Sequence, residues 1–144
     1  MYQNDFIRLR VGKNKESIMR VEISIGELLD KLSILYIKKK FISEASKLQN
    51  VQNEIDSLEP FALDFFASSE IKKLFDELEH TNLHLWNIED LIREKEKKKE
   101  FDQEFIDLAR AVYFTNDERA RIKKQINQKT GSNLVEEKSY QDYT

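Results

Sequence analysis

Apolar and polar residues alternate in two segments near the N-terminus. Residues 6–11 read Phe-Ile-Arg-Leu-Arg-Val, and residues 20–25 read Arg-Val-Glu-Ile-Ser-Ile. A period of two residues is typical of β-strands, because successive side chains of a strand point to opposite faces. Residues 12–17 have the composition of a turn. The pattern predicts a small N-terminal β-hairpin that leans on a helix, since two isolated strands are only marginally stable. A frayed N-terminal arm is the alternative.

The apolar period becomes helical after the second of these segments. Ser24 followed by Glu27 is a capping-box pattern, and apolar residues then recur at helical spacing until about Ile42. Ile34, Ile37 and the residues around them widen the apolar surface beyond one stripe, which indicates contacts on two sides. The sequence therefore predicts a central helix here.

Two more helices are predicted in the middle of the chain. Residues 44–58 carry one apolar stripe that ends before Pro60, which disfavours helical geometry in the preceding residue. The apolar segment 61–66 is expected to plug the end of a helical bundle. From about Ser69, apolar residues follow alternately three and four positions apart, the spacing of a bundle or coiled-coil seam. This pattern is lost in the charge run 95–100, which is expected to be frayed helix and loop.

The last predicted helix starts at Asp102 and ends near Gly131, a residue type enriched just after helix C-termini. A second capping box makes two helices broken near Phe114 the alternative, but one continuous helix is favoured because the apolar register holds throughout. The tail of residues 134–140 has an apolar start, and a third strand paired with the hairpin is one conformation open to it.

Length and composition agree with one helical domain. The chain of 144 residues suffices for a single core, and 35% charged residues with only three Gly and one Pro favour long helices. We expect a mainly α, four-helix bundle-like domain over residues 1–144 with the small N-terminal hairpin. The seam residues expected in one core are Leu28, Leu32, Leu35, Leu78, Leu85, Ile92, Leu108 and Val112.

Charge and residue usage exclude several classes of function. A net charge of −3 creates no positive field toward nucleic acid or an anionic membrane, and the basic residues of segment 119–129 spread around their helix. No apolar run approaches the roughly 20 residues of a membrane span. A cytoplasmic protein without nucleic-acid or membrane partners is therefore expected. His80 and His84 have a spacing that suits one metal, and Glu77 one turn earlier is a candidate third ligand. Because a third histidine and an aspartate cluster are missing nearby, we expect no metal and no cofactor.

Two polar rows lie beside the apolar seams of the last two helices. Arg119 occupies a seam position, and because burial of an unpaired guanidinium costs several kcal/mol, it needs an acid or an anionic ligand. Glu89 and Asp90 are the nearest acids if the helices are antiparallel neighbours. The rows then form either a site for a small anion or an internal salt-bridge network that sets the register. The candidate ligand-binding residues are Trp86, Glu89, Arg93, Asn116, Arg119 and Lys123.

Four segments resemble a family of small bacterial and phage helical proteins known as a domain of unknown function. They are residues 21–35, 85–93, 105–127 and 131–140, so the resemblance covers about residues 21–140. The resemblance implies a helical fold and no particular activity. An association of some relatives with cell-surface polysaccharide genes hints at a sugar-nucleotide or glycan context. The recurring polar positions of the family match Glu27, Lys31, Trp86, Glu89, Arg93, Arg110, Asn116, Arg119, Glu137, Lys138 and Tyr140.

Three functions remain open. The first is a non-catalytic helical module that binds a small anionic ligand or a protein partner through the polar rows. The second is a small all-helical enzyme that acts on an anionic metabolite by electrostatic stabilisation. The third is a structural element that forms homo-oligomers through its heptad seams. Polar residues on the seam favour the first two, and the spacing favours the third.

Overall fold

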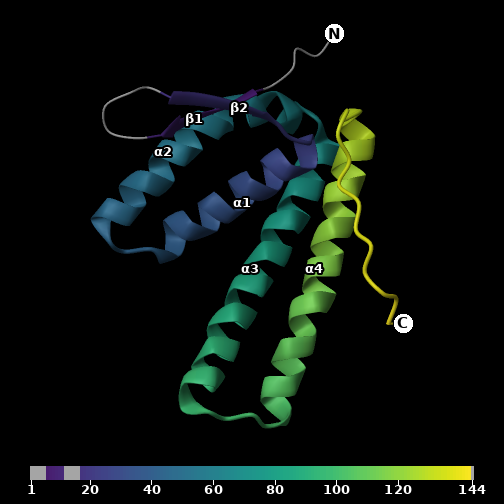
Figure 1. The fold of residues 1–144 in the computed structure, drawn as a ribbon. Coiled ribbons are helices and arrows are strands. Elements are labelled where there is room, and N and C mark those ends of the chain that lie inside the picture. The colour runs from purple at the N-terminus through teal and green to yellow at the C-terminus, as the bar shows by residue number, and fades with distance from the viewer. Residues whose placement is uncertain (1–5, 12–16, 144) are drawn as a thin grey trace.

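The computed structural model describes the backbone of residues 6–11 and 17–143 and the side chains of residues 19 and 21–143. Four helices dominate it, which confirms the mainly α class (Figure 1). The elements are β1 (Phe6–Val11), β2 (Ser17–Glu22), α1 (Ile25–Phe41), α2 (Ala45–Ala62), the 3-10 helix η1 (Leu63–Ala67), α3 (Ser69–Lys98) and α4 (Gln103–Thr130).

Strands β1 and β2 pair antiparallel, with Phe6 opposite Glu22, and β1 contacts α2. The turn expected at residues 12–16 lies outside the described residues. The second strand ends earlier than the alternating pattern suggested, because Ser24 already caps α1. Residues 134–140 do not pair with these strands, since the tail runs along α4 instead (Figure 1).

Helix α1 is central, as the wide apolar surface predicted. It contacts α2, α3 and α4, and Leu29 and Leu32 are completely buried in the core. Its first turn begins where the capping box was predicted, with the Glu27 amide donating to the Ser24 hydroxyl at 3.0 Å. This start brings the polar first turns of α1 to the side of α4.

Helix α2 does not stop before Pro60 but continues through it to Ala62, so the predicted end is wrong. Proline removes one backbone donor, but the last turn is retained because the Leu63 amide bonds to the Glu59 carbonyl and Ala62 is completely buried. The expected plug is formed by Phe65 and Phe66, which pack on the core, whereas Phe61 and Leu63 are exposed.

Helices α3 and α4 lie side by side and extend beyond α1 and α2 as a two-helix arm (Figure 1). Residues 95–98 are helical, which corrects the prediction of a frayed end. The reason is Lys95, whose ammonium bonds to Glu100, Asp102 and Glu104 at 2.6–3.2 Å and ties the end of α3 to the start of α4. Helix α4 is continuous, as favoured, and ends at Gly131 with φ 66°.

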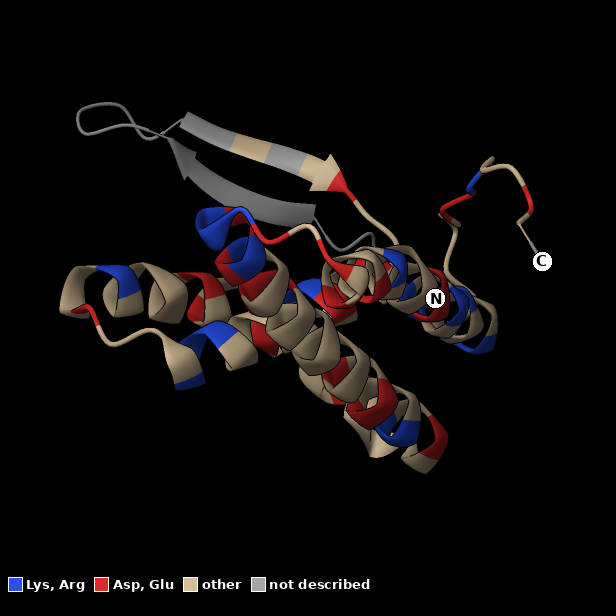
Figure 2. Ribbon diagram, turned by 90° about the horizontal axis from the view of Figure 1, so that it is seen from below, with Lys and Arg blue, Asp and Glu red and all other residues tan. Residues whose placement is uncertain are grey.

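Half of the predicted seam lies outside the core. Leu28, Leu32, Leu35 and Leu78 belong to it. Ile92, Leu108 and Val112 are only half-buried, because this part of the arm has two helices and no third helix covers their seam (Figure 1). Leu85 is half-buried because a pocket separates it from α1. The core therefore sits where α1 and α2 meet the root of the arm. Both acidic and basic residues occur on the helices outside it (Figure 2).

Candidate functional site

A buried carboxylate on α1 organises the polar residues at the root of the arm. Asp30 exposes 1% of its surface, and both its oxygens accept hydrogen bonds from Arg119 on α4. The Nε–Oδ1 distance is 2.8 Å and the Nη2–Oδ2 distance is 2.5 Å. This fork geometry is the strongest form of an ion pair between an arginine and a carboxylate. The hydrogen bonds to Asp30 raise the pKa of the Arg119 guanidinium.

Asn82 on α3 completes the surroundings of this carboxylate. Its side-chain nitrogen donates to Oδ1 of Asp30 at 2.9 Å and to the hydroxyl of Ser33 at 2.8 Å. The Ser33 hydroxyl in turn donates to the Asp30 carbonyl at 2.7 Å. Asp30 is thus held by groups from three helices.

Lys123 lies one turn beyond Arg119 on α4 and is also buried, with 7% of its surface exposed. Its ammonium contacts Glu27 at 2.6 Å, Glu136 at 2.7 Å and the Asp30 carboxylate at 4.0 Å. Burial acts to lower the pKa of Lys123, but the bonds to Glu136 and Glu27 prevail and raise it. The same ion pair lowers the pKa of Glu136.

The start of α1 is closed by side chains from the end of α4. The Gly26 amide donates to Oδ1 of Asn127 at 2.7 Å, and the Ile25 amide donates to the Ser132 hydroxyl at 3.2 Å. A β-carbon at Gly26 would stand 2.6 Å from the Lys123 carbonyl oxygen, so glycine permits this close approach. The free amides of this helix start, which otherwise attract anions, are therefore already occupied.

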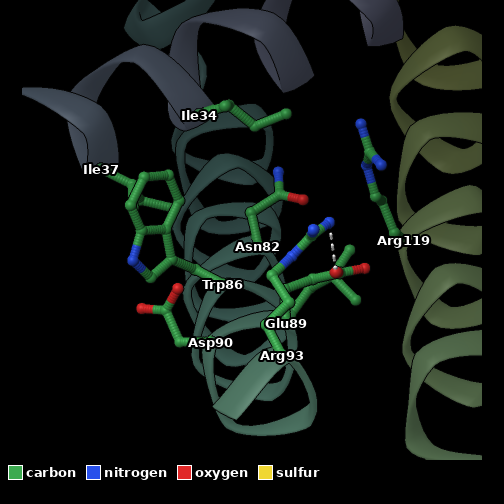
Figure 3. Close-up of a pocket in the computed structure, with 9 residues that line it drawn as sticks. Ile34, Ile37, Asn82, Trp86, Glu89, Asp90, Arg93 and Arg119 are labelled. Atoms are coloured by element: carbon green, nitrogen blue, oxygen red, sulfur yellow. Dashed lines mark hydrogen bonds and ion pairs between the residues drawn. The ribbon is translucent and has the colours of Figure 1, made fainter. Parts of the chain in front are cut away.

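A pocket of about 300 Å³ opens beside the Asp30–Arg119 pair, between α1, α3 and α4 (Figure 3). Trp86 stands on one side, Arg119 on the other, and Asn82 lies between them (Figure 3). The Trp86 indole is stacked on Phe41, with ring centroids 5.8 Å apart. The lining residues are Ile34, Ile37, Asn82, Leu85, Trp86, Glu89, Asp90, Arg93 and Arg119. The pocket combines an apolar, aromatic wall with a polar floor.

Two polar atoms of the floor have capacity left for a ligand. Nη1 of Arg119 makes one long contact of 3.4 Å with Asn116. The Asn82 side-chain oxygen accepts no hydrogen bond from the described residues, although Asn82 is only 4% exposed. Among the described residues, no fully buried side-chain nitrogen or oxygen lacks a partner. The unpaired Asn82 oxygen is therefore not fully buried, and it points into the pocket (Figure 3). The pocket is thus lined by one residue that can donate and one that can accept, both of which also bond to Asp30.

The structure brings four of the six predicted site residues to this pocket, namely Trp86, Glu89, Arg93 and Arg119. Lys123 is held in its own ion pairs, and its side chain does not line the pocket. The expectation that Glu89 or Asp90 pairs with Arg119 is wrong. Glu89 bonds to Arg93 at 3.2 Å, and Arg119 reaches Asp30 because α1 packs against both α3 and α4 at the root of the arm.

Asn116 lies at a second pocket of about 470 Å³, between α4 and the C-terminal tail. Its side chain donates to the Val112 carbonyl at 3.0 Å. The tail contributes Tyr143, whose hydroxyl donates to Asp117 and whose ring meets Tyr113 edge-on, with centroids 5.1 Å apart. The hydrogen bond to Asp117 raises the pKa of Tyr143 to about 12. The predicted row on α4 is therefore divided between two pockets and the Lys123 ion pairs.

Asp30 and Asn82 are the important residues that sequence reasoning did not select. Both lie beside apolar positions on predicted seams, and a polar residue at such a position is the available signal. His80 and His84 are both exposed on α3. In the parts of the chain that the structure describes, no three metal-ligating residues are grouped, and no helix has the length and apolar character needed to cross a membrane.

Comparison with known proteins adds a family. The profile of the family of unknown function DUF6165 matches residues 19–143, which include α1 to α4, both pockets and the tail. No curated protein and no solved structure matches the chain. Because the match covers almost the whole chain, including Asp30, Asn82 and Arg119, the protein belongs to the family of unknown function DUF6165.

Proposed function

We propose that this protein is a non-catalytic binding module whose pocket between α1, α3 and α4 holds a small ligand. The observation that supports this most is the pair of polar atoms at the pocket floor, Nη1 of Arg119 and the side-chain oxygen of Asn82. Both belong to residues that are fixed by Asp30, so the floor is preorganised. A pocket with an apolar wall and a few convergent polar groups is the usual form of a small-molecule site.

The pocket favours a ligand with a flat apolar body and an amide-like end. The Trp86 indole and the aliphatic side chains of Ile34 and Leu85 offer surface to a planar ring. An end group that accepts from Arg119 and donates to Asn82 matches both polar atoms. A primary amide does this with one carbonyl and one amino group.

The charges around the pocket argue against a strongly anionic ligand. Arg119 is neutralised by Asp30, and Arg93 is paired with Glu89. Asp90 lines the same pocket and forms no ion pair with the described residues. The lining therefore offers no uncompensated positive charge. For the same reason the enzymatic alternative is less favoured, because electrostatic stabilisation of an anionic transition state requires such a charge.

Three small molecules of the same shape separate these possibilities. Benzamide, benzoate and benzamidine share a flat ring and carry a neutral, negative or positive end group. Trp86 is the single tryptophan of the chain, so its fluorescence reports on the pocket directly. We expect benzamide to bind best, with a Kd on the order of millimolar for so small a molecule. If benzoate bound most tightly, the pocket would be an anion site, as the sequence predicted. If none of the three changed the fluorescence, the proposed pocket function would be contradicted.

A matched pair of variants locates the binding. Leu85→Phe narrows the pocket beside Trp86, whereas Leu108→Phe makes the same change at a half-buried position of the arm outside it. Binding of benzamide should be weakened in the first variant and kept in the second. Equal affinities in both would show that the fluorescence change arises elsewhere.

A further inference from the structure

A row of solvent-facing side chains runs along α3. Successive members are four, three, four, four, three and four residues apart, which keeps them on one face of the helix. The members are Asp76, His80, Leu83, Asn87, Leu91, Glu94 and Lys98. Leu83 is half-buried and the others are exposed, Leu91 with 48% of its surface. Within the described part of the chain, no hydrogen bond or ion pair joins any of them to another element.

This row is self-complementary when its direction is reversed about Asn87. The reversal places Asp76 opposite Lys98, which joins an acid to a base. It also places Leu83 opposite Leu91, which joins two apolar side chains. His80 comes to lie opposite Glu94, which joins an imidazole to a carboxylate. A two-fold interface between identical chains requires this property, because residue i of one copy meets residue j of the other while j meets i.

Along α3 as a whole, acidic residues come first and basic residues last, as Asp76 and Lys98 do in the row. Residues 76–90 contain five acidic residues and no Lys or Arg, whereas residues 93–99 contain five basic and two acidic residues. Antiparallel pairing of two copies of α3 places the acidic stretch of each against the basic stretch of the other. Parallel pairing places like charges together, which is unfavourable.

The centre of the row offers both attraction and register. Leu83 and Leu91 flank Asn87 on each side, so two copies bring four leucine side chains around the axis. The two Asn87 amides meet at the axis, where each donates to the other. An asparagine in a helical interface is a known means of fixing register and oligomer state.

We propose that α3 joins two copies of this chain as a symmetric antiparallel dimer, with the two-fold axis at Asn87. This inference goes beyond the proposed ligand binding and does not depend on it. Of the pocket residues, Glu89 lies nearly opposite Asn87 on α3 by the helical spacing, and Trp86 lies about a quarter turn to the side of it. The pocket thus remains accessible in the dimer.

Charge reversal with rescue tests the pairing. In the Asp76→Lys dimer two lysines oppose each other at each contact, and in the Lys98→Glu dimer two acids do so. Each variant alone should dimerise at least tenfold more weakly than the wild type, as sedimentation velocity measures. An equimolar mixture should dimerise like the wild type, because the heterodimer regains both opposite-charge contacts. General damage to folding would not be repaired by mixing.

Two control variants change the same charges elsewhere. Asp64→Lys in η1 and Lys39→Glu on α1 are exposed positions outside the row and should leave the dimer unchanged. A direct test uses the absence of cysteine from the chain. Asn87→Cys should be cross-linked to a covalent dimer by a short bis-maleimide, whereas Lys39→Cys should remain a monomer on a denaturing gel.

A monomeric wild type at about 100 μM, a concentration far above that needed for a micromolar dimer, would overturn the inference. A dimer that neither charge reversal weakens would also overturn it, since its interface would then lie elsewhere. Binding of benzamide by a monomeric protein would leave the pocket function intact while refuting the dimer, so the two proposals fail separately.

Discussion

Asp30 and Arg119, 89 positions apart in the chain, form a two-pronged ion pair that joins α1 to α4. The carboxylate is almost completely buried, while the guanidinium side chain keeps 26% of its surface exposed. The pair stands at the root of the arm, where it bounds the pocket on one side and the core on the other. It therefore belongs at once to the packing of the fold and to the candidate site.

Replacement of Arg119 by Met should destabilise the protein by about 3 kcal/mol, because it leaves the Asp30 carboxylate buried without its main partner. The remaining donors from Asn82 and the distant Lys123 ammonium compensate only part of this loss. Urea unfolding of the wild type and the variant measures the difference.

The double variant Asp30→Leu with Arg119→Met should recover part of this stability, since no buried charge remains. The control Arg121→Met removes an exposed arginine that pairs with Glu118 on the same helix, and it should change stability by less than about 0.5 kcal/mol. A stable Arg119→Met protein would mean instead that the charge of Arg119 is kept for a ligand.

Much of the fold follows from local patterns. The start of α1 at Ser24, the continuity of α4 and its end at Gly131 depend on residues close together in sequence, and all three were predictable. The course of the chain at Pro60 was not, because burial of Ala62 depends on the tertiary structure. Neither was the end of α3, where Lys95 gathers acids from beyond the turn.

The candidate site shows the same division between local and distant information. The rows of polar residues were visible because helical spacing groups them, and the need of Arg119 for an acid followed from its seam position. Which acid it finds depends on how α1 packs against α3 and α4. Spacing within one helix carries no information on that packing, so Asp30 was not identified as the partner.

The two halves of the α3 seam should respond differently to truncation. Leu78 is completely buried, and Leu78→Ala should cost about 2–5 kcal/mol of unfolding free energy. Leu85 is half-buried beside the pocket, so Leu85→Ala should cost only about 1 kcal/mol, since part of its side chain is already in contact with water. Urea unfolding monitored by circular dichroism gives both values. Equal losses would show that the arm is covered in solution, for instance by a second copy.

The close contact between the start of α1 and α4 requires a glycine at position 26, because glycine has no β-carbon. Gly26→Ala should destabilise the protein by about 1–3 kcal/mol, because the added β-carbon lies within 3 Å of the Lys123 carbonyl and the helices must separate. The control Gly131→Ala meets no atom within 4 Å and suffers only the strain of a left-handed backbone, about 1 kcal/mol. Thermal melts rank the two. A larger effect at Gly131 would contradict the close packing at Gly26.

The C-terminal tail should detach from α4 at acid pH, because protonation of Glu136 breaks its ion pair with Lys123. Lys123 lowers the pKa of this carboxyl in the folded protein, so the ion pair stabilises the attached tail above the ordinary pKa of a glutamate, about 4.3. This contribution is lost as the pH falls through the lowered pKa, where Glu136 becomes protonated. Hydrogen exchange of residues 133–143 should therefore accelerate, beyond its intrinsic pH dependence, as the solution is acidified through this range.

Glu136→Gln should show fast exchange in the tail already at neutral pH, because the neutral amide cannot replace the charge that Lys123 requires. Glu137→Gln provides the matched control, since Glu137 is 74% exposed and lies 3.6 Å from Lys124 in a solvent-screened pair. Its tail should exchange like that of the wild type. If both variants behaved alike, the tail would be held by the contacts of Tyr143 with Tyr113 and Asp117 rather than by the buried ammonium, and its release would then follow the Tyr143 hydroxyl at alkaline pH, near 12.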